Sequence, residues 1–272
     1  MGTHGFCAGT LVHTEQGLVP IQEIKVGDMV LSSPEQGNSS IREYKPIINT
    51  FKAESEEIYE LVIRKTVSPD LEYVEDGIQH NIYEMVYLTG EHPVYVENSV
   101  FIEGWDNTNQ VEQINARSRS WQVVKDLRLY DQIIVSSPQH GDETGYEIVN
   151  IAPVQDVNRD YGFISAATVD DNKPFDTVVY LSNDHYRIVG GDIKDDHSVN
   201  IFIDYFIGPY RHTDFPSDYP LYKDFQENYG KIIANVGGYI TDIPTLCRPV
   251  YNFEVEDYHT YFVGEQGLWV HQ

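Results

Sequence analysis

Short segments rich in β-branched and aromatic residues, each bounded by Gly, Pro, Asn or Asp, recur through most of the chain. Such segments are typical of strands, and no part of the sequence shows sustained helical periodicity. Strands are expected at 10–14, 29–31, 58–63, 83–88, 94–96 and 133–135, and short helical segments at 20–24, 123–127 and 221–227. The sequence of 272 residues therefore predicts an all-β fold with a small amount of helix.

A weak internal repeat adds to this expectation. The segment 21–31 aligns with the segment 124–134, with Asp28 opposite Asp131 and apolar residues at matching positions except that Met29 meets Gln132. The spacing of about a hundred residues is too long for a solenoid. The repeat instead indicates an old duplication inside one domain.

The amino-acid composition changes between 138 and 245, where Tyr, Asp, Asn, Pro and Gly dominate. Strand signals in this segment are modest, and the clearest are at 177–181 and 199–203. Apolar alternation resumes at 250–255 and 260–263, which are interpreted as closing strands that pair with the N-terminal half. We therefore predict a leader at 1–6, a main domain formed by 7–137 and 246–272, and an insertion at 138–245.

The charge of the chain excludes some classes of function. With 43 acidic and 18 basic residues the formal charge is −25, so binding to nucleic acid is not expected. No run of about 18 apolar residues occurs, which argues against a membrane-spanning helix. The two cysteines, Cys7 and Cys247, cannot form a disulfide framework.

Three groups of residues could carry chemistry. Cys7 precedes an expected strand and is followed by Ala8-Gly9, although a lone cysteine is more often a small core residue. His92 lies in Thr89-Gly90-Glu91-His92-Pro93, where proline favours an extended histidine that could equally cap a turn. Two more histidines, His259 and His271, frame the last expected strands, and Gln272 ends the sequence.

Together these groups resemble the motifs of Hedgehog/intein (Hint) domains, in the same order. The first motif is carried by Cys7-x-Gly9-Thr10-Leu11-Val12-x-Thr14 and continues to Gly27-Asp28-x-Val30, and the second by Thr89-x-x-His92-Pro93. The segment 250–264 with Val270-His271-Gln272 is similar to the two C-terminal motifs, most closely to those of Hint domains that precede the toxin module of polymorphic secreted bacterial toxins. The resemblance covers 7–137 and 246–272 and implies a horseshoe-like Hint fold with pseudo-twofold duplication and an inserted subdomain.

The resemblance also implies a self-processing reaction at each end. Cys7 would attack the Phe6 carbonyl in an N-to-S acyl shift, with His92 protonating the leaving amide nitrogen and Thr89 orienting the scissile peptide. At the other end, the side-chain amide of Gln272 would cyclise onto its own carbonyl and release the downstream polypeptide, with His271 polarising that carbonyl and His259 assisting proton transfer.

Two positions depart from the family pattern. Gln272 replaces the usual Asn and must close a six-membered ring instead of a five-membered one, so slower C-terminal cleavage is expected. Asn252 stands where many inteins carry an Asp that helps to activate the first cysteine, and Asn cannot act as a base.

The expected function is autocatalytic cleavage that releases a downstream module such as a toxin. A protein-splicing intein and a catalytically silent β module used for binding are the alternatives. The flanking polypeptides in cis would be the partners, and a monomer without cofactor or metal is expected, although Cys247 could join Cys7 and a histidine on zinc. The localisation is left open, with a secreted bacterial protein as one setting.

Overall fold

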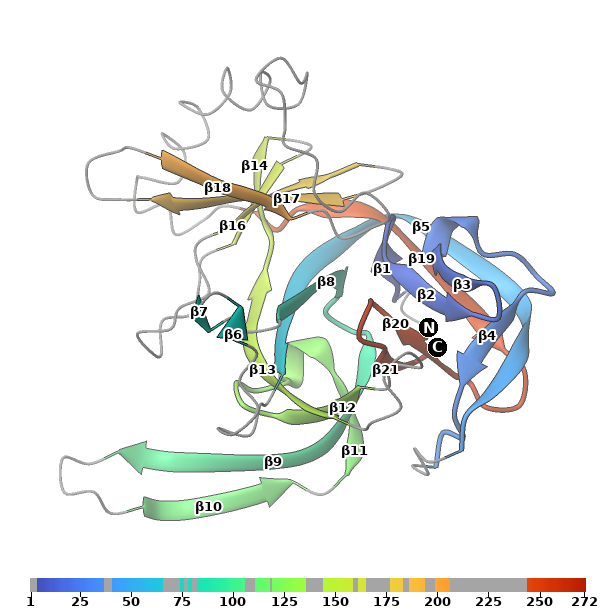
Figure 1. Ribbon diagram of the computed structural model, residues 1–272, viewed down its shortest axis with the longest axis horizontal. Coiled ribbons are helices and arrows are strands. Elements are labelled where there is room, and N and C mark those ends of the chain that lie inside the picture. The colour runs from blue at the N-terminus through green and yellow to red at the C-terminus, as the bar shows by residue number, and fades with distance from the viewer. Residues whose placement is uncertain are drawn as a thin grey trace.

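Strands β5 and β19 run antiparallel to each other and curve through the middle and right of Figure 1. The computed structural model describes residues 4–36, 41–65, 74–75, 78–79, 83–105, 111–117, 119–135, 144–158, 161–164, 177–182, 186–193, 199–205 and 244–272. The strands of the main sheet are β1 (Phe6–Cys7), β2 (Leu11–Thr14), β3 (Gly17–Pro20), β4 (Met29–Ser32), β5 (Glu43–Lys65), β8 (Tyr83–Thr89), β9 (Pro93–Trp105), β10 (Val111–Arg117), β11 (Ser120–Val123), β12 (Gln132–Val135), β13 (Thr144–Pro153), β19 (Cys247–Val255), β20 (Thr260–Val263) and β21 (Leu268–His271).

The order of the strands brings both ends of the chain into the same part of the main sheet. Strand β1 is paired with β19 on one side and with β8 on the other, and β21 is paired with β20, β12 and β9. The ends labelled N and C accordingly lie near each other in Figure 1. Buried apolar side chains, most of them from the main sheet, form one large cluster. This cluster, called here the central cluster, includes Phe6, Leu88, Phe253 and Tyr261.

The internal repeat is visible in the backbone hydrogen bonds. A 3₁₀ helix, Ile21–Glu23 or Val124–Asp126, leads in each half to a turn closed by Asp28 or Asp131. Asp28 Oδ2 accepts the Lys25 amide at 2.8 Å, and Asp131 Oδ2 accepts the Arg128 amide at 3.0 Å.

The correspondence extends to the two turns that carry candidate residues. The Thr10 amide donates to the Cys7 carbonyl, and in the other half the His92 amide donates to the Thr89 carbonyl. The 3₁₀ helices are anchored in the same manner, because the Ile21 amide donates to the Thr10 carbonyl and the Val124 amide to the His92 carbonyl. The turn at Cys7 and the turn at Thr89 are therefore equivalent positions of a pseudo-twofold duplication.

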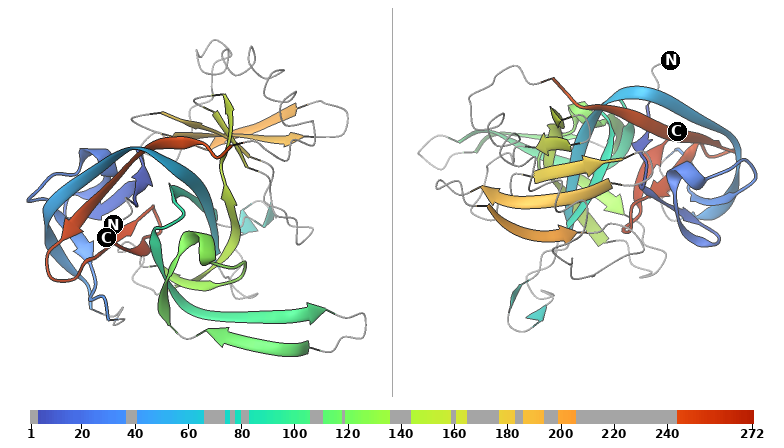
Figure 2. Two further views of the ribbon diagram at one scale, coloured as in Figure 1. Left: turned by 180° about the vertical axis from the view of Figure 1, so that it is seen from behind. Right: turned by 90° about the horizontal axis from the view of Figure 1, so that it is seen from above.

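The chain between β13 and β19 forms a second sheet. Its strands are β14 (Gln155–Asn158), β15 (Tyr161–Ile164), β16 (Thr177–Leu181), β17 (Tyr186–Ile193) and β18 (Val199–Tyr205). Figure 2 shows it beside the main sheet. The segments on either side of the second sheet are hydrogen-bonded to β5 of the main sheet. The Val154 amide donates to the Ile58 carbonyl at 2.8 Å, and the Ile58 amide donates to the Leu246 carbonyl at 3.0 Å. A short hairpin of β6 (Val74–Glu75) and β7 (Ile78–Gln79) completes the described strands.

The prediction of an all-β chain with an internal duplication is confirmed. The expected helical segments at 20–24 and 123–127 are single 3₁₀ turns, while 221–227 lies outside the described residues. No helix among the described residues is long and apolar enough to cross a membrane.

Several strands differ in extent from the expectation, among them β9, which runs from Pro93 to Trp105 where only 94–96 was expected. Strand β5 begins at Glu43, well before the expected 58–63, because its first half is largely exposed and polar and so lacks an apolar pattern. Within the segment predicted as an insertion, β13 belongs to the main sheet, where it pairs with β5 and β12, so the separate sheet begins at Gln155.

Candidate functional site

The residues just before Cys7 are built into the sheet. The Thr89 amide donates to the Gly5 carbonyl at 3.0 Å, and the Gly5 amide returns a bond of 3.1 Å to Thr89 Oγ1. A Cβ atom at Gly5 would lie 2.5 Å from the Tyr251 carbonyl oxygen, so only glycine fits between β19 and Thr89. Phe6 is fully buried in the central cluster. The Phe6–Cys7 peptide is therefore fixed from both sides.

Asn252 on β19 also holds this leader segment. Its Nδ2 donates to the His4 carbonyl at 3.0 Å, while its Oδ1 accepts the Tyr261 hydroxyl at 2.7 Å and the Phe253 amide at 2.8 Å. The two donors on Oδ1 define which end of the amide faces His4. An aspartate here would have no donor for that carbonyl, so Asn252 positions the leader backbone.

His92 lies in the turn between β8 and β9, against the side chain of Phe6. Its imidazole is 0% exposed, its ring centroid is 4.2 Å from that of Phe6, and neither ring nitrogen has a hydrogen-bond partner among the described residues. Burial lowers its pKa well below the usual value, with smaller contributions from His4 and His271. A neutral imidazole with two unsatisfied nitrogens costs about 1–3 kcal/mol for each unmade bond, which is the kind of cost that reactive sites retain.

Cys7 points away from His92. Successive side chains of a strand face opposite sides, and whereas Phe6 enters the central cluster, Cys7 enters a second one. This second cluster, called here the Cys7 cluster, combines residues of the main sheet with residues of the second sheet and its connecting segments. Its members are Cys7, Ile58, Tyr87, Val154, Ile164, Val179, Leu181, Leu246 and Val250.

The apolar surroundings suppress ionisation of the Cys7 thiol. Cys7 is 2% exposed, and burial raises the pKa of its thiol to about 12, opposed in part by the positive charge of Arg248. At pH 8 such a thiol is ionised in only about one molecule in ten thousand. Cys247, in contrast, is exposed, and both cysteines are free thiols.

At the other end, the side chain of Gln272 is held by two partners. Its Oε1 accepts the Val255 amide at 2.5 Å, and its Nε2 lies 2.7 Å from His259 Nδ1. An amide nitrogen can only donate, so Nδ1 of His259 must be the acceptor, and its proton must be on Nε2 if the ring is neutral. The nitrogen that would attack is thus already paired with a base.

His271 reaches the carbonyl of the same residue. Its Nδ1 lies 2.9 Å from the Gln272 backbone oxygen, and its Nε2 lies 3.1 Å from a carboxylate oxygen of Glu35. The ring of Trp121 packs edge-on against the imidazole, with centroids 5.3 Å apart. The two histidines therefore contact the two groups of Gln272 that the expected cyclisation would join.

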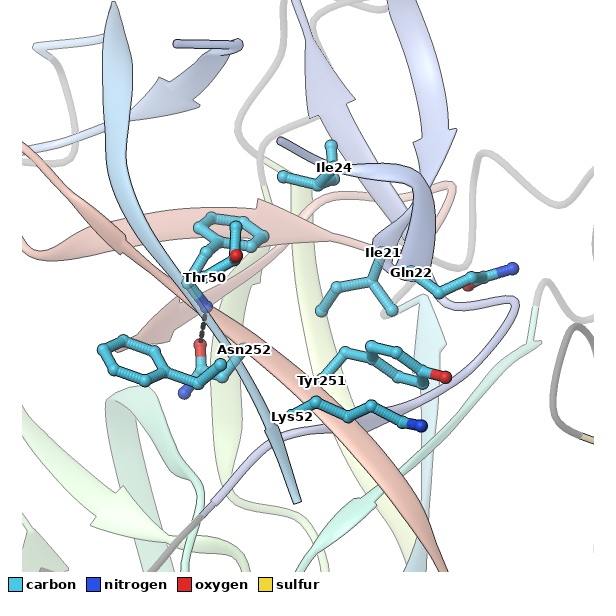
Figure 3. A pocket seen from close by; sticks show the side chains of 9 residues that line it. Ile21, Gln22, Ile24, Thr50, Lys52, Tyr251 and Asn252 are labelled. Carbon is cyan, nitrogen blue, oxygen red and sulfur yellow. Dashed lines mark hydrogen bonds between the residues drawn. The ribbon is translucent and has the colours of Figure 1, made fainter. Parts of the chain in front are cut away.

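The two ends form one region. His92 interacts electrostatically with His4 on the N-terminal side and with His271 on the C-terminal side. A pocket of about 220 Å³ lies between Ile21 and Gln22 on one side and Tyr251 and Asn252 on the other (Figure 3). Lys52 of β5 also lines it (Figure 3).

The structure thus brings most of the sequence-predicted residues together in two groups, but it places the Cys7 thiol elsewhere. Thr89, His92 and Asn252 surround the leader, and His259 and His271 contact Gln272, whereas the Cys7 thiol faces the second sheet. Asp257, two residues before His259, forms a 3.2 Å ion pair with Lys45 and is exposed. Within the described residues no group of three or more His, Cys, Asp or Glu side chains is placed to hold a metal ion.

Sequence reasoning missed Glu35 and Trp121. Both contact His271, yet Glu35 stands in a turn and Trp121 in a short strand, far from the motif in sequence. No pattern in the sequence could have identified them, because only the pairing of the strands brings them together.

Comparison with known proteins gives a likeness in structure only. The sequence matches no protein-family profile and no curated protein. Among solved structures, similar chains include the bacterial intein-like domain from Clostridium thermocellum, at 16% identity and a TM-score of 0.45 over 100% of both chains. The gp41-1 intein has 12% identity and a TM-score of 0.40 over 100% of both chains. The DnaB intein from Synechocystis sp. PCC 6803 has 9% identity and a TM-score of 0.42, covering 99% of this chain and 98% of the other.

Proposed function

We propose that this chain is an autoprocessing domain of the Hint type that acts on its own flanking polypeptides, and that its principal reaction is cleavage after Gln272. The released segment would be a downstream module such as a toxin. The observation that carries the proposal is the position of Gln272, whose attacking amide contacts His259 and whose carbonyl contacts His271. Nucleophile, base and electrophilic activator thus converge on one residue.

The C-terminal step can be written with all atoms balanced. Nε2 of Gln272 attacks the carbonyl carbon of the same residue and loses one proton to His259 Nδ1, while His271 Nδ1 donates to the developing oxyanion. The peptide bond to the next residue then breaks, and the leaving amine takes a proton from His271. The products are a C-terminal glutarimide and a free amino terminus.

The N-terminal step is held back by the same fold. In the acyl shift, the Cys7 thiolate attacks the Phe6 carbonyl, the Phe6–Cys7 amide bond breaks, and the freed nitrogen is protonated by the imidazolium of His92. The raised thiol pKa makes the thiolate scarce, and the low pKa of His92 makes its protonated form scarce. Release of Phe6 would also empty its site in the central cluster, a loss that typically costs about 3–5 kcal/mol.

Extending the chain beyond Gln272 with a small reporter protein tests the proposal. We expect the reporter to be released within hours to days, with the mass of a glutarimide or its hydrolysis product at the new C-terminus. His271→Ala should slow release on the order of a hundredfold, because one hydrogen bond to the oxyanion is lost. No release from the unmodified chain, or equal release from His271→Ala, would refute it.

A catalytically silent binding module is the second candidate, and the burial of Cys7 favours it. Dithiothreitol separates the two possibilities at the N-terminal end, because it intercepts a thioester and releases residues 1–6. A silent module releases nothing at either end. A splicing intein would differ from a cleavage domain in having Cys, Ser or Thr directly after Gln272.

A further inference from the structure

His271 contacts an acceptor on each of its ring nitrogens. Nδ1 faces the Gln272 carbonyl oxygen at 2.9 Å, and Nε2 faces Glu35 Oε1 at 3.1 Å. A carbonyl oxygen and a carboxylate can only accept hydrogen bonds, whereas a neutral imidazole has a single N–H. Both contacts can be hydrogen bonds only when His271 is an imidazolium, with a proton on each nitrogen.

His259 has the opposite requirement. The Val255 amide fixes Oε1 of Gln272, so Nε2 is the atom that faces His259 Nδ1. Nδ1 accepts from that amide only while it carries no proton. The site therefore needs one neutral and one charged histidine at the same pH, which is the usual division between a base and an acid.

The segment that carries Glu35 is fixed to the hairpin that carries both histidines. Ser32 Oγ donates to the Thr260 carbonyl at 2.6 Å, and Thr260 Oγ1 donates to the Ser33 carbonyl at 2.5 Å, with all three residues fully buried. Thr260 follows His259 directly and is paired with His271 in the β20–β21 register.

Trp121 adds a second restraint to the same segment. Its indole nitrogen donates to the Glu35 carbonyl at 3.2 Å, and its ring packs on the imidazole of His271. Glu35 is thus held in place although its side chain is 48% exposed.

We propose that Glu35 is a positioning residue for C-terminal cleavage: its carboxylate keeps His271 doubly protonated, so that Nδ1–H can donate to the Gln272 carbonyl. This inference rests on the proposed function and assigns to the site a residue outside the predicted motifs. The other titratable groups around His271 are His92, which is fully buried, and His259 across Gln272.

The effect should appear as a change in pH dependence. Glu35→Gln removes one of the two acceptors that face the imidazolium, so the alkaline limit of cleavage should move to lower pH. Above that limit the reporter-extended variant should cleave about threefold more slowly than the unmodified chain. At lower pH, where His271 is protonated in both proteins, the two cleavage rates should converge. A merely structural role would lower the rate equally at every pH.

Glu54→Gln is the matched control, because Glu54 is exposed, pairs with Lys52 and changes the net charge by the same amount. Its cleavage profile should coincide with that of the unmodified chain. If the unmodified chain cleaves and Glu35→Gln has the same profile, the assignment of Glu35 is wrong.

A second readout separates this inference from the proposed function. In the chain ending at Gln272, NMR titration of the His271 ring nitrogens should show loss of the second proton at lower pH in Glu35→Gln than in the unmodified protein. The terminal carboxylate is present in both and cancels. Failure of cleavage with a shifted titration would refute the proposed function alone, and an unshifted titration would refute the role of Glu35.

Discussion

At the residue scale, two carboxamide side chains are fixed by having a partner at both ends. Asn252 accepts from Tyr261 and donates to the leader, and Gln272 accepts from Val255 and faces His259 with its nitrogen. In each case a carboxylate would lose the donated bond. Specific hydrogen bonds thus hold the side chains at both positions where the sequence departs from the Hint motifs that it resembles.

Gln272→Asn should speed C-terminal cleavage by about tenfold, because a five-membered succinimide has one rotatable bond fewer to immobilise than a glutarimide. The rate of reporter release from the extended chain, monitored by mass spectrometry, measures the change. A slower variant would contradict this expectation, since it would mean that the reach of the longer side chain to His259 and Val255 matters more than ring size.

The sequence motifs identified candidate residues that lie in turns and at strand ends. They could not identify residues that only tertiary contacts bring together. Thr89, His92 and the pair His271-Gln272 lie at strand ends or turns, which short patterns predict well. The partner of His271 and the burial of Cys7 depend instead on which strands meet, and no pattern near Glu35 or Leu181 encodes that meeting.

At the scale of elements, the β20–β21 hairpin is held at its turn by two buried titratable groups. The Glu84 carboxylate accepts the amides of Glu265 and Gln266, the second at 3.0 Å, and His13 Nε2 lies 2.7 Å from the Gly264 carbonyl. Gly264 has φ of +78°, and a Cβ there would overlap Glu84 Oε1. The turn thus fixes the register that sets His271 opposite Thr260.

Glu84 should make the fold less stable as the pH rises. Burial raises its pKa to about 8, partly offset by the two amides, so the folded protein binds this proton more tightly than the unfolded chain. The free energy of unfolding therefore falls as the pH rises from the unfolded value near 4.5 through 8. His13, whose pKa burial lowers to about 4, acts in the opposite direction only below its unfolded value of 6.5.

Denaturant unfolding at pH 6.5 and 8.5 tests this. Glu84 should account for a loss of about 2 kcal/mol between the two pH values, and Glu60, whose pKa burial raises to about 7, should add a smaller loss that is the same in every variant. Glu84→Gln should be less stable at pH 6.5 by about 1–3 kcal/mol, because its amide group faces a backbone donor, and its stability should change little up to pH 8.5. Glu57→Gln, an exposed change on β5, should keep the original dependence; a steep dependence in Glu84→Gln would contradict the assignment.

At the scale of the whole molecule, the second sheet covers the Cys7 thiol. Val179 and Leu181 of β16 and Ile164 of β15 pack on the same cluster as Cys7, and the guanidinium of Arg248 donates to the Leu181 carbonyl. The main sheet holds the segments around Phe6 and Gln272, and burial between the two sheets raises the pKa of the Cys7 thiol. The two ends therefore differ, because the Gln272 side chain contacts His259 whereas the Cys7 thiol is covered.

The cover can be weakened without touching the main sheet, and Cys247 supplies an internal standard because it is an exposed free thiol in the same chain. An aromatic disulfide reagent should modify Cys247 at once and Cys7 slowly. Leu181→Ala removes a buried side chain from the interface at a cost of about 2–5 kcal/mol, so the slow phase should accelerate by about thirtyfold or more if the second sheet separates locally. Ile47→Ala is the matched control, since Ile47 is as deeply buried but lies in the central cluster. Equal acceleration in the two variants would mean that Cys7 is reached only by global unfolding, and the second sheet would then not be a separable cover.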